Sequence, residues 1–140
     1  MIIQVYSQQQ AVEYAGYTKS KTSIISITSK EDADVVFPEN PNLVFVLHMK
    51  FNDLTAEYDE EGIPYGRPLP QPEDFTGLKS FVRKLTCEIL IVHCFEGKSR
   101  SAAVARAIYE FLGRKDDLRV RKDALPNPRV YDLACGELGI

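Results

Sequence analysis

The sequence lacks the features that mark several classes of protein. Its 140 residues carry 17 Lys or Arg against 20 Asp or Glu, a formal net charge of −3, so no basic excess argues for nucleic-acid binding. No apolar stretch is long enough to span a membrane, and Met1–Val5 lacks the basic start of a signal peptide. We therefore expect a soluble, cytoplasmic monomer that binds neither nucleic acid nor membranes.

Cysteine is also scarce. The three cysteines, Cys87, Cys94 and Cys135, cannot all pair with one another, and no C-x-x-C spacing or neighbouring histidine pair accompanies them. This pattern disfavours a disulfide framework and a zinc site, and it suits a reducing compartment. We expect no metal and no cofactor. Cys87 and Cys135 are expected to be core residues, with a role as disulfide partner of an oxidised Cys94 as the alternative.

The remaining composition, 44% apolar and 26% charged, is that of an ordinary globular domain, and residues 1–140 fit one domain. Strand patterns alternate with helical patterns along the chain. Strands are predicted over 2–6, 22–28, 42–49 and 88–92, and helices over 8–15, 72–85 and 102–112. The tail 126–134 opens with proline and is predicted to continue as a short helix. This alternation predicts an α/β domain with a central, mainly parallel sheet flanked by helices.

Three segments allow more specific predictions. The continuous apolar run 42–49 is typical of a parallel strand covered on both faces, and His48 within it is expected to be a core histidine. Residues 33–37 form either a further strand or a simple apolar tie. The basic segment 114–122 is expected to be solvated.

Residues 55–72 form the one long irregular segment, with four prolines and the acidic group Glu57, Asp59, Glu60 and Glu61. Loops of this length in compact domains are usually functional or disordered. A lid over a site and a solvated excursion both remain open for this segment.

The most informative stretch is a loop that starts at Cys94, after an apolar strand, and ends at Arg100, where a helix begins. Backbone amides and a helix N-terminus meet in such a loop and suit an oxyanion. The same positive environment, together with a hydroxyl from Ser101, lowers the pKa of a thiol at Cys94. Arg100 can pair with two phosphate oxygens at once, and residues 95–99 would supply amides. His93 is expected to orient the loop by hydrogen bonds.

A thiolate beneath a bound phosphate is placed for in-line attack on phosphorus. The leaving oxygen then needs a proton from a general acid. Asp53 is the first candidate because it follows the strand 42–49 and can reach the same edge of the sheet. Asp59 is the second candidate and Asp74 the third.

The stretch His93-Cys94-Phe95-Glu96-Gly97-Lys98-Ser99-Arg100-Ser101 resembles the signature loop of cysteine-dependent protein phosphatases, and most of all their compact dual-specificity branch. The segment 49–53 resembles the strand and loop that carry the general-acid aspartate in that branch. Residues 124–130 are similar to the tail of small bacterial and phage members. The resemblance covers residues 43–133. The gap between Asp53 and Cys94 is longer than in those relatives, which keeps Asp59 open as the acid.

The resemblance implies a phosphotyrosine protein phosphatase-like fold and a phosphocysteine intermediate on Cys94. Its implied catalytic residues are Cys94, Arg100, Asp53 and Ser101, and its implied substrate-binding residues are Phe95, Glu96, Gly97, Lys98 and Ser99. The implied substrate is a phosphorylated protein or small phosphomonoester. A non-protein phosphate (a phosphoinositide, an inositol phosphate or an RNA 5′ end) is the alternative, with Lys98 as a hint of it unless Glu96 neutralises that charge. A non-catalytic phosphate-binding module is the remaining option.

Overall fold

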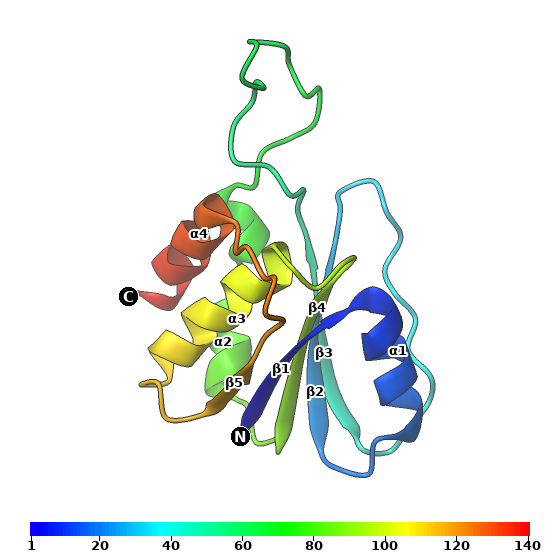
Figure 1. The fold of residues 1–140 in the computed structure, drawn as a ribbon. Coiled ribbons are helices and arrows are strands. Elements are labelled where there is room, and N and C mark those ends of the chain that lie inside the picture. Colours follow the sequence, from blue (N-terminus) through cyan, green and yellow to red (C-terminus); the bar gives the residue numbers. More distant parts are fainter.

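The computed structural model describes all residues, 1–140, as a parallel five-stranded sheet between two helical layers (Figure 1). The strands stand in the order β3-β2-β4-β1-β5. Helix α1 covers one face of the sheet, and the other helices cover the opposite face. The predicted α/β class and parallel sheet are confirmed. No helix is both long and apolar enough to cross a bilayer.

The elements follow the alternation of strand and helix patterns in the sequence. The strands are β1 (Ile2–Ser7), β2 (Thr22–Thr28), β3 (Leu43–Lys50), β4 (Ile89–Cys94) and β5 (Asp117–Arg119). The helices are α1 (Gln8–Tyr17), the 3₁₀ turn η1 (Pro72–Phe75), α2 (Leu78–Arg83), α3 (Arg100–Phe111) and α4 (Pro128–Leu138). The helix predicted over 72–85 is therefore two pieces, because Gly77 adopts φ +93 between them.

The centre of the sheet is the most deeply buried part of the molecule. All seven residues of β2 are buried, and so are the last five of β4. Between the sheet and α2, α3 and α4 lies the main core, which includes Ile25, Leu90 and Ile108. A smaller cluster of Ala11, Ala15, Ile24 and Ile91 packs under α1. Since β4 lies between β1 and β2, its carboxyl end is surrounded by supporting backbone.

Strand β3 differs from the prediction. It lies at the edge of the sheet, and Phe45 is 55% exposed, so the strand is not covered on both faces. His48 is not a core residue either: it is partly exposed, with its Nδ1 4.0 Å from Asp34 Oδ1. A continuous apolar run does not distinguish an edge strand from a central one, because position in the sheet depends on distant partners.

The structure also tests the predictions for two segments outside the main strands, 33–37 and 114–122. Residues 33–37 form no strand, and Phe37 instead packs on the α1 cluster and meets the His93 ring edge-on at 5.8 Å. Of the two alternatives for 33–37, the apolar contact segment without strand structure is therefore the correct one. The segment 114–122 is not wholly solvated, since β5 pairs in parallel with Ile2–Gln4 of β1. Its three residues have little strand character of their own and are ordered by this pairing.

Candidate active site

Cys94 is the last residue of β4 and lies at the base of a pocket of about 170 Å³. The residue is 97% buried, and its thiol lies 3.0 Å from the Ser101 hydroxyl and 3.3 Å from the amide nitrogen of Gly97. Burial raises the pKa of this thiol, but hydrogen bonds from the Ser101 hydroxyl and from the Ser101 and Gly97 amides, with the charge of Arg100, outweigh it. The net pKa is below the ordinary thiol value.

The loop between Cys94 and α3 is built to expose its amides. The N–H groups of Phe95, Glu96, Lys98 and Ser99 donate to no protein acceptor, and Gly97 donates to the sulfur. The Ser99 side chain does not cap α3 but donates to Asp53 Oδ1 at 2.8 Å. The N-terminal turn of α3 therefore keeps donors for an anion.

Gly97 is required at its position. Its φ is +76, and a Cβ there would lie 2.6 Å from the carbonyl carbon of Tyr6 and 2.7 Å from the nitrogen of Ser7. The loop thus packs directly against the junction of β1 and α1. A side chain would have to push the loop away from that junction, because both neighbours are backbone.

Arg100 is 93% buried and held from one side. Its Nη1 donates to Ser29 Oγ and to the Phe51 carbonyl oxygen, each at 3.1 Å. Its buried Nε–H has no acceptor in the protein. A buried guanidinium donor without an acceptor costs free energy, and Arg100 lines the same pocket as Cys94 and the loop residues, which suits an oxyanion.

His93 orients the loop. Its Nδ1 lies 3.2 Å from the Cys94 carbonyl oxygen, and its Nε2 lies 2.6 Å from Ser26 Oγ. Because a carbonyl only accepts, Nδ1 carries the proton and Nε2 accepts from the serine. Burial lowers the pKa of His93, so the ring is neutral near pH 7 and the positive charge at the sulfur comes from Arg100. These contacts fit the predicted orienting role.

Asp53 lines the same pocket as Cys94 and Arg100. Its Oδ1 accepts from Ser99 Oγ and from Asn127 Nδ2, both at 2.8 Å, while no partner holds Oδ2. Asn127 also caps α4 through its side-chain oxygen. The carboxylate is thereby fixed by the loop after Cys94 and by the N-terminus of α4.

The other two acid candidates lie elsewhere. The Asp59 carboxylate accepts from the amides of Glu61 and Ile63 inside the 55–72 segment, and Asp74 binds Lys30 Nζ at 2.6 Å and caps η1. Neither residue lines the Cys94 pocket, and no residue of 55–72 does. In Figure 1 this segment projects away from the body of the domain.

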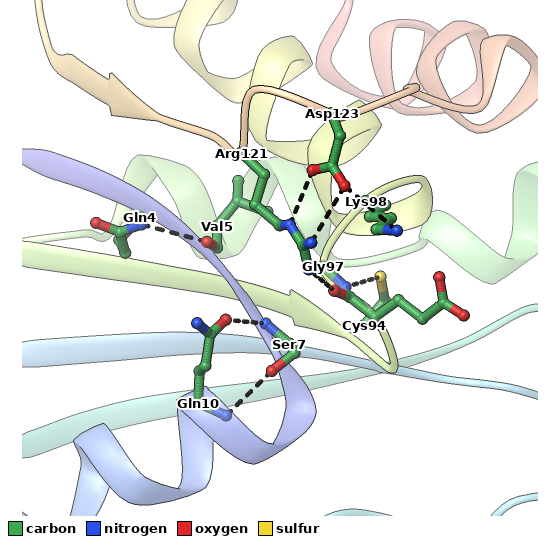
Figure 2. Close-up of polar contacts among 10 residues, drawn as sticks. Gln4, Val5, Ser7, Gln10, Cys94, Gly97, Lys98, Arg121 and Asp123 are labelled. Atoms are coloured by element: carbon green, nitrogen blue, oxygen red, sulfur yellow. Dashed lines mark hydrogen bonds and ion pairs between the residues drawn. The ribbon is translucent and has the colours of Figure 1, made fainter.

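The predicted substrate-binding residues are brought together in part. Phe95, Glu96, Lys98 and Ser99 line the pocket with Cys94 and Arg100, and Gly97 faces the sulfur through its amide. Figure 2 shows that Lys98 and Arg121 share the carboxylate of Asp123, with Lys98 Nζ at 3.3 Å and Arg121 Nε at 2.9 Å. The partner of Lys98 is thus Asp123 and not Glu96.

The other cysteines do not contact the Cys94 thiol. Cys87 precedes β4 at the opposite end of the strand, about 20 Å away for seven extended residues. Cys135 lies two turns into α4 beyond Asn127 and does not line the pocket. A disulfide needs Cα atoms within roughly 7 Å, so Cys87 is excluded as a direct partner in this conformation. No group of three or more His, Cys, Asp or Glu residues is arranged to hold a metal ion.

Sequence reasoning missed several supports of the site. Asn127, Ser29 and Arg121 contact the loop or the residues that line the pocket, and Ser26 contacts His93, which orients the loop. Only Asn127 carried a local signal, because Asn before proline marks a helix cap. That signal locates the cap and not its distant partner Asp53.

Comparison with known proteins gives no relative. No protein-family model, no curated protein and no solved structure matches this chain.

Proposed function

We propose that the protein is a phosphomonoester hydrolase of the protein tyrosine or dual-specificity phosphatase type. One observation carries the proposal: a thiol of lowered pKa lines the same pocket as buried Arg100, whose Nε–H has no acceptor, and as a loop whose amides are unpaired. The parallel sheet, the loop between Cys94 and Arg100 and the helix behind it support a phosphotyrosine protein phosphatase-like fold for residues 1–140.

In the first step, the substrate phosphate binds the loop amides and Arg100 above the sulfur. The Cys94 thiolate attacks phosphorus in line, so that the S–P bond forms as the P–O bond to the leaving group breaks. Asp53 lies in the same pocket with its Oδ2 unengaged, and it donates the proton that converts the leaving oxygen to a phenol or alcohol.

In the second step, the Asp53 carboxylate takes a proton from water, and the oxygen of that water attacks the phosphocysteine. The P–O bond forms as the S–P bond breaks, which releases inorganic phosphate and returns the thiolate. Ser101, 3.0 Å from the sulfur, donates to the departing thiolate. The charges in both steps are met by Arg100, amides and a hydroxyl, and no metal is assigned a part.

The thiolate also bears on where the enzyme works. A low-pKa thiol is open to oxidation, and oxidised Cys94 cannot attack phosphorus. We therefore place the enzyme in a reducing compartment such as the cytoplasm. Every residue to which the mechanism assigns a role belongs to one chain, and we propose a monomer as the working unit.

The test is the Cys94→Ser variant. The wild-type protein is expected to hydrolyse para-nitrophenyl phosphate, and the variant to show no turnover while tungstate, an oxyanion of similar shape, still binds by calorimetry. Retained turnover in the variant contradicts a phosphocysteine mechanism. Wild-type protein that binds tungstate without hydrolysing any aryl phosphate contradicts catalysis and favours a phosphate-binding module.

A further inference from the structure

A second depression adjoins the Cys94 pocket. It has a volume of about 550 Å³ and is lined by Ser7, Gln8, Gln9, Val12, Glu13 and Phe95. We call it the α1 groove, since all its residues except Ser7 and Phe95 belong to the first turns of α1. Phe95 also lines the Cys94 pocket, so the two depressions share this residue.

The α1 groove is rigidly joined to the loop. The amide of Gln8 donates to the carbonyl oxygen of Phe95 at 3.1 Å, which ties the start of α1 to the residue after Cys94. Ser7 and Gln10 form a reciprocal capping box that fixes this end of the helix, as Figure 2 shows. Phe95 itself is 69% exposed. A large apolar side chain is thus presented to solvent on a fixed backbone, at the rim of the site.

The charge around the α1 groove is acidic. Glu13 is its one charged residue, and the side chain's only partner is the Gln9 amide, at 3.3 Å. Glu96, on the rim of the Cys94 pocket, makes no side-chain hydrogen bond or ion pair. Across the pocket, Lys98 shares Asp123 with Arg121. The α1 groove therefore offers no cation to a second phosphate, whereas the opposite rim has two cations that share one carboxylate.

We propose that the α1 groove binds the side chain two positions from the phosphorylated residue in a peptide chain, and that it prefers an apolar or basic side chain there. This proposal rests on the phosphatase function above and names its substrate class as phosphorylated protein. Successive side chains of an extended peptide point to opposite sides, so the side chain two positions from the phosphoresidue points to the same side, about 7 Å along the chain. That side chain reaches the α1 groove across Phe95. Phe95 packs against it, and Glu13 attracts a positive charge.

A polyanionic substrate fits this arrangement less well. On the α1 side, a further phosphate of a phosphoinositide or inositol polyphosphate would meet Glu96 and Glu13, whose negative charges repel it. On the opposite rim, Lys98 and Arg121 share one carboxylate and keep a net positive charge. The acidic α1 groove therefore favours a peptide side chain over a second phosphate on its own side of the pocket.

The test uses phosphotyrosine hexapeptides in which each flanking position in turn is leucine, lysine or glutamate. At one position two residues from the phosphotyrosine, kcat/KM is expected to be roughly threefold higher or more for leucine and lysine than for glutamate, the size of an exposed charge interaction. The Glu13→Lys variant should reverse the order of the lysine and glutamate peptides. Its turnover of para-nitrophenyl phosphate, which has no flanking residue, should not change.

Glu88→Lys is the matched control, because Glu88 is exposed at the opposite end of β4 and the charge change is identical. This variant should leave the ratios of kcat/KM between the peptides unchanged. If the ratios of kcat/KM between peptides are equal in wild type and Glu13→Lys, and para-nitrophenyl phosphate turnover is normal, the proposed role of the α1 groove is overturned while the phosphatase proposal stands. Faster turnover of an inositol polyphosphate than of every peptide also overturns it. Wild-type protein inactive on para-nitrophenyl phosphate overturns both proposals.

Discussion

Two irregular segments follow parallel strands at the same edge of the sheet, and they are held very differently. The loop 94–100 is bonded along its whole length, through Phe95 to α1, through Lys98 to Leu125 and through Ser99 to Asp53 and Asn127. The segment 55–72 is fixed near its base, where Asn52 binds the Pro68 carbonyl and Arg129 binds that of Pro70. Beyond that base it bonds mainly to itself, as at Asp59.

This difference shows that a segment that follows a strand at the right edge of the sheet does not by that alone hold its groups in fixed positions at the site. Fixed donors stabilise a transition state because they need no reorganisation when the charge develops. The loop 94–100 meets that requirement, and its rigidity comes from residues distributed over the whole chain. The segment 55–72 resembles the loop in lying after a strand, but it brings no group to the sulfur. Three substitutions, each paired with one in the segment, test the comparison.

The largest effect is expected for Asp53→Asn. Loss of a general acid lowers kcat by about 10²–10⁴-fold, with little change in KM, since phosphate binding rests on Arg100 and the amides. The loss should be greater for phenyl phosphate than for para-nitrophenyl phosphate, whose leaving group departs more easily without a proton. Steady-state kinetics on both substrates measure this loss of kcat.

Asp59→Asn is the paired variant and should keep wild-type kcat, because its carboxylate caps a turn far from the pocket. If Asp59→Asn lost kcat while Asp53→Asn stayed active, Asp59 and not Asp53 would be the general acid. It would show that the segment folds over the site during turnover.

Gly97→Ala is expected to destabilise the fold by about 3 kcal/mol, from the left-handed backbone and the 2.6 Å contact with Tyr6 combined. Gly62→Ala has a similar φ of +79 but nothing within 4 Å, so about 1 kcal/mol is expected. Thermal unfolding of both variants measures the difference. An equal decrease in stability in both variants would mean that the loop is not held against the β1–α1 junction.

Ser101→Ala should have the smallest effect, a loss in kcat of roughly tenfold for one hydrogen bond to a charged sulfur. Removing the donor raises the pKa of Cys94, so the thiolate fraction at pH 6 falls and iodoacetamide alkylation slows. The alkylation profile should therefore move to higher pH. Thr55→Ala, which removes an exposed hydroxyl in the segment, should leave the profile in place. An unmoved profile in Ser101→Ala would contradict the role of this contact.

The sequence predicts the local parts of this molecule well. The strand, loop and helix around Cys94 are specified by neighbours in the chain, so β4, the amide-rich turn and α3 follow from residues 89–112. Asp53 could be placed at the same sheet edge because parallel strands end together. Its presence in the Cys94 pocket agrees with that expectation.

The parts that failed depend on distant partners. The edge position of β3, the exposure of His48 and the pairing of β5 are set by sheet order, which local composition does not encode. The bonds of Asn127 to Asp53 and of Gln8 to Phe95 join residues more than seventy positions apart. Such contacts appear only once the chain is folded.

The central claim is that phosphate passes through the sulfur of Cys94. Rapid acid quench of Asp53→Asn during turnover, followed by peptide mass spectrometry, tests it most directly, because slow second-step hydrolysis should let the intermediate accumulate. We predict one phosphoryl group on the peptide that contains Cys94, absent when Cys94 is also replaced by serine. A phosphoryl group on another residue, or product formed by the wild type with no phosphoenzyme in either protein, would contradict the mechanism.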